Sequence, residues 1–201
     1  MVVHSKNTGK IVSAAMSLLQ SRGYASVMVK DICRVAGVSH SSFYAVFTGK
    51  DDVLLHVLRG YKDDAEDTMR RLLLAESDLE KIWILYVKYL SLAEEFGPEL
   101  MGALFALELE GKCSVTEAVN EYMDRYLEWF LRFVGNCQEA GIIRNKGRAQ
   151  DLIPLGVELT FFIVYEWCVS QGGFPLRERA FAAMENLFDI APKHRGVRPQ
   201  A

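Results

Sequence analysis

The residues whose types could do chemistry gather in one short stretch, Ser39-His40-Ser41-Ser42-Phe43-Tyr44-Ala45. Three serine hydroxyls, one imidazole and one phenol stand there, and no side chain of the stretch is formally charged. Groups of this kind both donate and accept hydrogen bonds. The chemistry predicted for the stretch is therefore recognition through short hydrogen bonds and close contact.

The elements that must position these side chains are two short helices within residues 29–47. The pattern predicts one helix, a tight turn at Gly37 and a second helix capped by Ser39. Glycine at the turn supplies the positive φ that ends the first helix. Five apolar residues are spaced to share one small core: Ile32, Ala36, Val38, Phe43 and Phe47. This is a helix-turn-helix arrangement, whose second helix enters the major groove of DNA.

The charge distribution favours the same interpretation. Residues 1–50 hold six cations against the single acid Asp31, a net charge of +5. Because the whole chain of 201 residues carries −3, the remainder carries −8. A basic first quarter joined to an acidic body is typical of a DNA-binding module followed by a separate second module.

Apolar spacing of 3.6 residues continues through the rest of the chain, and no strand pattern competes with it. Thr48 and Asp51 resemble a capping box that opens a fourth helix running to Leu72. Further helices are predicted over residues 77–97, 98–110, 114–141, 149–170 and 176–188, with a break at Gly97-Pro98. The fold class is all-α: a three-helix helix-turn-helix domain and a larger helical domain, about nine helices in total.

The most apolar segment, residues 152–170, contains Glu158 and Glu166. Each acid would cost about 2.5–3.5 kcal/mol at the centre of a bilayer, so we expect a helix buried between protein partners and no membrane contact. No secretory leader opens the sequence, which predicts a cytoplasmic protein.

The four cysteines lack any metal-ligand or disulfide spacing, which predicts no metal site and buried thiols. A redox-sensing Cys113 is the alternative.

The first fifty residues resemble the TetR family of bacterial transcriptional regulators. The resemblance rests on a set of short motifs: Gly23-Tyr24, Val29-Lys30-Asp31-Ile32, Ala36-Gly37-Val38-Ser39, Phe43-Tyr44, Phe47 and Lys50. It implies a homodimer, a two-fold symmetric operator in double-stranded DNA, and a ligand pocket in the second domain. The expected domains are residues 1–50 for DNA binding and 51–191 for ligand binding and dimerisation, with a flexible tail over 192–201.

By the family pattern, Tyr44 and Lys50 hold the DNA backbone while His40, Ser41 and Ser42 approach base edges. The full set of predicted DNA-binding residues is Ser39, His40, Ser41, Ser42, Tyr44, Ala45, Lys50, Lys30 and Lys6. Ala45 is suited to contact a thymine methyl group, since the helix lacks the cations that usually pair with guanine. The chain departs from the family at Met28, where a capping Thr is usual, and at Val46, where His or Tyr is frequent. Ser26 is the candidate replacement for the missing cap.

Large aromatic side chains are frequent in the second domain, and an apolar or aromatic small molecule is the expected ligand. The predicted ligand-binding residues are Trp83, Tyr86, Met101, Phe105, Glu108, Tyr122, Met123, Tyr126, Phe161 and Tyr165. The last two helices are apolar around much of their circumference, which predicts a dimer surface. Its residues are Leu159, Phe162, Ile163, Trp167, Phe181, Met184 and Phe188.

These features predict a repressor that binds a palindromic operator as a dimer and is released by its ligand. The alternative is a DNA-binding regulator, repressor or activator, that answers to a protein partner or to no small molecule. A helical enzyme is the competing class. No Ser-His-Asp order, glycine-rich phosphate loop or metal-ligand cluster supports it, so we expect no catalytic residues and no cofactor.

Overall fold

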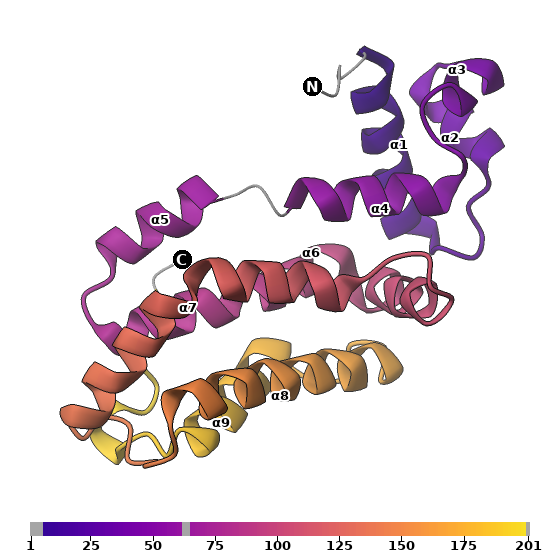
Figure 1. Ribbon diagram of the computed structural model, residues 1–201. Helices are drawn as coiled ribbons and strands as arrows, with labels where there is room; N and C mark the ends of the chain where they lie inside the picture. Colours follow the sequence, from indigo (N-terminus) through magenta and orange to yellow (C-terminus); the bar gives the residue numbers. More distant parts are fainter. Residues whose placement is uncertain (1–5, 62–64, 200–201) are drawn as a thin grey trace. The chain divides into compact units, whose positions relative to one another are not determined.

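A computed structural model describes residues 6–61 and 65–199, and these are helical apart from their connecting turns (Figure 1). The elements are α1 (Lys6–Arg22), α2 (Val29–Ala36), α3 (His40–Tyr44), α4 (Lys50–Tyr61), α5 (Ala65–Leu74), α6 (Asp78–Leu109), α7 (Val115–Glu139), α8 (Ala149–Val169), α9 (Leu176–Leu187) and the 3-10 turn η1 (Pro192–His194). The described part of the chain contains no strand, only one isolated bridge between Ile143 and Ile190. The predicted all-α class is confirmed.

The chain divides into two compact units, and the first is built from two separate parts of the sequence. Unit 1 comprises Met1–Asp63 and Glu99–Val115, whereas unit 2 comprises Asp64–Pro98 and Thr116–Ala201. The boundary predicted after Lys50 differs from this division. The reason is that α4 packs against α1 and buries its own apolar side chains in unit 1.

The core of unit 1 orients the helix-turn-helix. Ile32 and Phe43 are fully buried and Phe47 nearly so, as the spacing predicts. Gly37 ends α2 with φ at 65°, and its backbone N–H donates to the carbonyl of Cys33. A side chain at this position would be strained, so the glycine fixes the angle at which α3 leaves α2.

Two predicted helix boundaries meet different outcomes. The break at Gly97-Pro98 is confirmed, since Gly97 has φ at 77° and interrupts α6. The long helix predicted from Thr48 to Leu72 corresponds to α4, which starts at Lys50, and α5, and residues 62–64 between them lie outside the described part of the chain. The capping carboxylate of α4 also differs from the prediction. Asp52, not Asp51, accepts a hydrogen bond from the Thr48 N–H at 3.0 Å.

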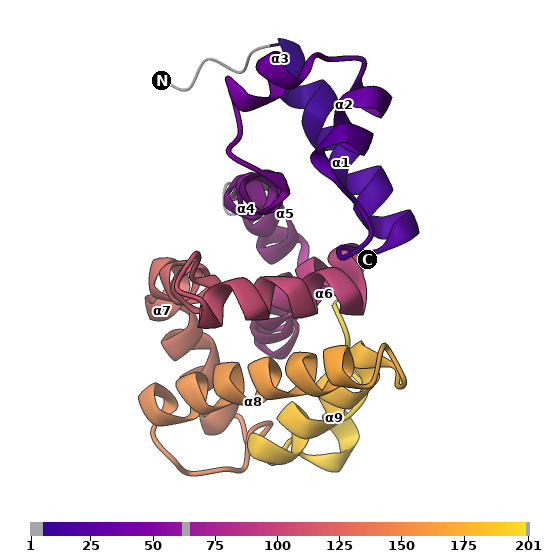
Figure 2. The same cartoon turned by 90° about the vertical axis from the view of Figure 1, so that its right-hand side faces the viewer.

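Unit 2 has its own aromatic core, over which α8 and α9 pack together (Figure 2). Among the described residues, α8 alone is long and apolar enough to span a membrane by length and composition. One side of α8 is buried in the core, including Ile153, Ile163 and Val164.

Residues 192–199, which the sequence predicts to belong to a flexible tail, contact α9 in the structure. Glu185 in α9 is buried, and its carboxylate accepts from the N–H of Gly196 at 2.9 Å and from Arg198 at 2.6 Å. The Arg198 guanidinium also lies 4.3 Å from the ring centre of Phe181. Polar composition suggested disorder, but the cations of the segment have a buried acid to bind. Residues 200–201 lie outside the described part of the chain.

Three of the four cysteines are buried thiols, as expected: Cys33, Cys137 and Cys168. Burial raises the pKa of Cys137 to about 12 and that of Cys168 to about 11. Thiols with such values are almost wholly protonated near neutral pH and therefore weak nucleophiles. Cys113 is half-buried, with its sulfur 3.7 Å from the carbonyl oxygen of Leu104.

Candidate nucleic-acid interface and aromatic core

The serines of α3 form a hydroxyl cluster at the start of the helix. Ser39 caps α3 by accepting a hydrogen bond from the backbone N–H of Ser42 at 3.1 Å, so the predicted cap is confirmed. The Ser39 hydroxyl also lies 2.8 Å from that of Ser41 and 2.9 Å from that of Ser42. Part of the hydrogen-bonding capacity of these three side chains is thus engaged within the helix itself.

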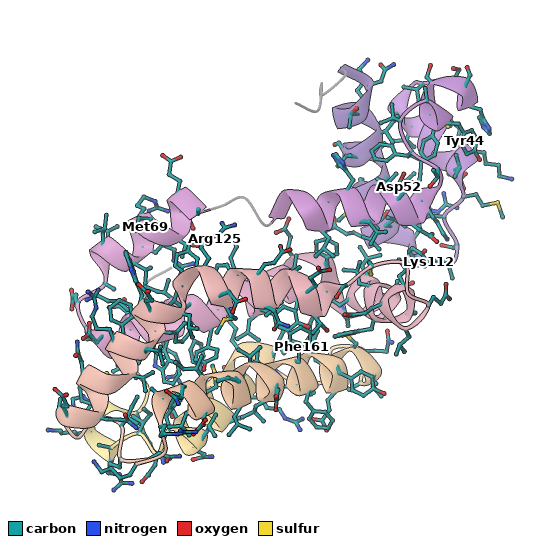
Figure 3. The ribbon with its side chains drawn as sticks, viewed as in Figure 1. Tyr44, Asp52, Met69, Lys112, Arg125 and Phe161 are labelled. Atoms are coloured by element: carbon teal, nitrogen blue, oxygen red, sulfur yellow. The ribbon has the colours of Figure 1, made fainter. Side chains whose placement is uncertain are left out.

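The outward side of α3 and of the turn that follows it is aromatic and aliphatic. Tyr44 is 56% exposed and lies on the outer side of unit 1 (Figure 3), and Ala45 and Val46 beside it are also exposed. The His40 ring meets the Tyr44 ring edge-on, with centroids 6.4 Å apart. Because Phe43 and Phe47 are buried on either side, the three residues between them must face outward.

Lys50, predicted to hold a DNA phosphate, is engaged by its own chain. Its ammonium group donates to the carbonyl oxygens of Tyr24 and Val27, the latter at 3.1 Å. The same nitrogen lies 4.1 Å from the centre of the Tyr24 ring. Lys50 therefore ties the start of α4 to the loop between α1 and α2.

The other predicted DNA contacts differ in their surroundings. Lys30 is exposed on α2, whereas the side chain of Lys6 lies outside the described residues. Between the cations of this region sits Asp31, 3.9 Å from Arg22 and 3.4 Å from Arg34. A hydrogen bond from the Met28 N–H is the main reason that the pKa of Asp31 lies below its usual range. Ion pairing with Asp31 thus lowers the net positive charge around α2.

Ser26 does not replace the missing cap of α2. Its hydroxyl donates backward to the carbonyls of Arg22 and Gly23, so it closes the end of α1 instead. Met28 occupies the cap position of α2 without any side-chain hydrogen bond to the helix. The Asp31 carboxylate takes over part of this role by accepting from the Met28 N–H at 3.2 Å.

Sequence reasoning missed the polar connections around Tyr24. The Tyr24 N–H donates to the Glu99 carboxylate at 2.8 Å, and its hydroxyl donates to Asp51. Asp51 also lies 3.7 Å from the ammonium group of Lys112. Burial, the hydrogen bond to Asp51 and nearby acidic charges raise the pKa of Tyr24. One tyrosine thus connects the α1–α2 loop, the start of α4 and the segment Glu99–Val115.

The glycine before this tyrosine is favoured by its backbone conformation and leaves room for Glu99. Gly23 has φ at 79°, which strains other residues, and a Cβ atom there would overlap a carboxylate oxygen of Glu99. The only sequence signal for this arrangement was the pair Gly23-Tyr24 in the family motif. Glu99 and Lys112 carried no signal, because their contacts join residues far apart in the chain.

The predicted ligand-binding residues divide between the two units. Met101, Phe105 and Glu108 belong to unit 1, where the Glu108 carboxylate accepts from the Ser114 hydroxyl at 3.4 Å. The others belong to unit 2, where Trp83, Tyr86, Met123 and Tyr126 form part of the core cluster. Trp83 meets the rings of Phe181 and Phe188 edge-on.

Three further aromatic residues differ in exposure. Phe161 stacks on Tyr89 with ring centroids 4.5 Å apart, from the side of α8 that faces α6 (Figure 3). Tyr122 packs against Tyr126 at 5.0 Å, and burial raises the pKa of Tyr122. Tyr165 is 51% exposed and does not belong to the core.

Tyr86 shows how closely the unit 2 core is fitted. Its hydroxyl is buried and donates to the carbonyl of Ile153 in α8 at 3.0 Å. A Cβ atom at Gly156 would lie 2.5 Å from that hydroxyl oxygen. The glycine therefore allows α8 to approach α6 at this point.

Most residues predicted for the dimer surface belong to the chain's own core, which corrects that assignment. Five of the seven are at most 9% exposed: Ile163, Trp167, Phe181, Met184 and Phe188. Phe162 is 57% exposed and Leu159 half-buried. The apolar pattern could not separate the two sides of α8, because one side meets α9 and the other stays apolar although it is uncovered.

Comparison with known proteins identifies the family of residues 11–57. Residues 11–57 match the family model described as bacterial regulatory proteins, tetR family. The chain is also 35% identical over 91 residues to an uncharacterized HTH-type transcriptional regulator, YwcC of Bacillus subtilis. Residues 11–57 form a TetR-family DNA-binding domain. The match covers 40% of this chain and 41% of YwcC, so the chain aligns with less than half the length of that relative.

The similarity to solved TetR-type structures extends over nearly the whole chain. The fatty acid degradation regulator FadR of Bacillus halodurans has a TM-score of 0.62, with 20% identity and 98% of both chains covered. FadR of Bacillus subtilis, solved in complex with stearoyl-CoA, has a TM-score of 0.60 at 20% identity, covering 90% of this chain and 97% of that one. At this identity the likeness concerns the fold: a TetR-family helix-turn-helix domain followed by a larger helical domain.

Proposed function

We propose that this chain is a cytoplasmic transcriptional regulator that binds a palindromic operator as a homodimer and is released by an apolar small molecule. The observation that carries the proposal is the TetR-type helix-turn-helix, whose α3 has its outward side exposed and its inward side anchored by Phe43 and Phe47. A single short recognition helix contacts few base pairs, so two copies about 34–36 Å apart are needed for a tight site.

The side of α8 that is not buried supports the homodimer. Four large apolar side chains there are about half exposed or more: Leu155, Phe162, Tyr165 and Val169. They recur at intervals of seven, three and four residues and therefore share one helix face. An uncovered apolar stripe of this kind is typical of a protein interface. At its edge, Glu166 pairs with Arg179 at 2.6 Å.

A small-molecule effector is supported by the aromatic composition of the second domain and by the FadR structures of the same fold. Because one of these was solved with stearoyl-CoA, a long-chain acyl-CoA thioester is the first ligand class to test. An aromatic molecule is the alternative. Coupling of about 1–3 kcal/mol between the ligand and DNA sites would lower operator affinity about 5- to 150-fold.

The deciding experiment recovers DNA fragments from the genome of the source organism on the purified full chain, at moderate salt and with competitor DNA. We expect enrichment of a few fragments that share a palindrome. Tyr44→Ala should abolish the enrichment, whereas Leu73→Ala, which changes a 78% exposed residue on α5, should leave it intact. Binding without sequence preference at every salt concentration would refute the proposed function.

Stearoyl-CoA is then titrated into the complex of protein and recovered operator. Release of DNA at a saturable concentration supports the ligand-responsive repressor. If stearoyl-CoA and a panel of aromatic compounds all leave the complex intact, regulation by a protein partner or without a ligand becomes the better description.

A further inference from the structure

The segment of the chain expected to meet base edges carries no formal charge. Between Ser39 and Gly49 there is no Arg, Lys, Asp or Glu. The commonest specific contact to DNA, a bidentate pair from Arg or Lys to guanine, is therefore missing from this segment. The Ser39 hydroxyl lies within hydrogen-bonding distance of the Ser41 and Ser42 hydroxyls, which lowers the capacity of these groups to select a base.

What this segment does offer is exposed apolar surface. Tyr44 is 56% exposed and Val46 38% exposed, with the exposed methyl group of Ala45 between them. Both flanking residues, Phe43 and Phe47, are buried in the unit 1 core, so the direction of these three side chains is fixed by packing.

The major groove offers only one apolar partner for such a surface. Guanine, cytosine and adenine present hydrogen-bond donors and acceptors there, whereas thymine adds a C5-methyl group. Apolar side chains pressed against the other base edges would remove water from polar groups without replacing their hydrogen bonds. Against a thymine methyl group the same side chains gain buried apolar area.

We propose that Ala45 and Val46, beside the Tyr44 expected at the DNA backbone, form a thymine-reading surface that recognises C5-methyl groups in each operator half-site. This inference rests on the proposed function and states what the end of the recognition helix and the turn after it read. It assigns a specificity role to Val46. In the sequence analysis this position is only a departure from the His or Tyr that is frequent in the family.

The test removes single methyl groups from the recovered operator. Each thymine is replaced in turn by uracil, which keeps the base pair and its hydrogen bonds, and the affinity of the full chain is measured. At one or two positions per half-site, uracil should weaken binding about fourfold, the value of one buried methyl group. Replacement in both half-sites should weaken binding by more than tenfold.

Matched variants connect the lost methyl group to these side chains. Val46→Thr is isosteric and Ala45→Ser nearly so, and each replaces an apolar contact by a hydroxyl. In at least one of them, uracil at the sensitive position should cost no further affinity. Val35→Thr is the control, because Val35 is 54% exposed on α2 and should keep the full response to uracil.

A second arm distinguishes thymine from 5-methylcytosine, which carries the same methyl group. Each cytosine of the operator is replaced by 5-methylcytosine, and unchanged affinity supports thymine as the group that is read. A gain of about fourfold on methylation, with no loss on uracil substitution, would overturn the assignment to thymine.

Two results separate this inference from the proposed function. If no DNA fragment is bound selectively, the proposed function itself fails. If a selective operator is recovered but uracil has no effect at any position, or the effect is equal in all four proteins, the thymine-reading surface is refuted while the regulator stands.

Discussion

The ammonium group of Lys50 is bonded to carbonyl oxygens of its own chain and lies over the Tyr24 ring. A charged donor with such partners stabilises a fold by about 1.5–3 kcal/mol. Lys50, which the family pattern assigns to a DNA phosphate, thus stabilises the α1–α2 loop in this structure.

We expect Lys50→Met to lower the free energy of unfolding by about 2 kcal/mol, because the loop carbonyls lose their donor while the aliphatic stem remains. Chemical denaturation measures this change. Lys30→Met is the matched control on the exposed side of α2 and should alter stability by less than about 0.5 kcal/mol.

The salt dependence of DNA affinity provides a second test of the Lys50→Met and Lys30→Met variants. Each lost phosphate contact reduces the slope of log K against log salt by about 0.9. We expect no such change for Lys50→Met. A reduced slope in that variant would show that Lys50 contacts phosphate directly after all.

Glu185 makes the closing segment of the chain sensitive to acid. Burial alone would raise its pKa, but the Gly196 N–H and the Arg198 guanidinium hold the pKa below the ordinary value of 4.5. The stabilisation that ionised Glu185 gives to the folded state is therefore complete above pH 4.5. It is lost as the pH falls through the lowered pKa of Glu185.

We expect hydrogen exchange of residues 192–199 to accelerate on acidification in that range, because protonated Glu185 no longer pairs with Arg198. Glu185→Gln should show the fast exchange already at neutral pH. The exchange rates are corrected for the intrinsic effect of pH. If residues 192–199 of the wild type are then equally protected above and below the pKa of Glu185, this account is contradicted.

Local sequence patterns predicted the helix cap, the turn and the buried aromatic residues of the helix-turn-helix. The Ser39 cap, the Gly37 turn and the buried pair Phe43 and Phe47 follow from short-range sequence rules. The partners of Lys50 and Asp51 could not be predicted in this way, because they are set by contacts between distant segments.

At the scale of elements, α8 is apolar on two sides, of which one is buried in the unit 2 core and the other is exposed. Its buried side includes Gly156, against which the Tyr86 hydroxyl lies. Sequence reasoning found the helix but assigned its buried side to a partner chain. Helical periodicity reports that a side is apolar and cannot say which apolar surface covers it.

We expect Gly156→Ala to destabilise unit 2 by about 1–3 kcal/mol, because its methyl group would overlap the Tyr86 hydroxyl. Alanine is the better helix former by about 1 kcal/mol, so the opposite sign is expected where space is free. Gly135→Ala in α7 is the matched control, since a Cβ atom at Gly135 would have no neighbouring atom within 4 Å. Thermal unfolding of both variants checks the pair. A stabilised Gly156→Ala would show that the core can yield at this point.

At the scale of the whole molecule, the apolar stripe on α8 decides the oligomeric state that we propose. We expect Phe162→Glu to shift the protein from dimer to monomer, because a carboxylate would be buried without a partner in the interface. Sedimentation velocity over a range of concentrations measures the change.

Leu73→Glu on α5 is the control for the dimer test, because Leu73 is 78% exposed and lies outside the stripe. It should leave the sedimentation coefficient unchanged. A Phe162→Glu protein that remains dimeric at low micromolar concentration would mean that another surface joins the copies.

Unit 1 includes Glu99–Val115, although this segment follows unit 2 residues in the chain. A chimaera that joins residues 1–63 of this protein to the second domain of a relative would therefore inherit foreign residues opposite Tyr24 and Asp51. We expect such exchanges to work only where an acid equivalent to Glu99 comes with them. Among relatives, the small residue at position 23 and the acid at position 99 should then change together during evolution.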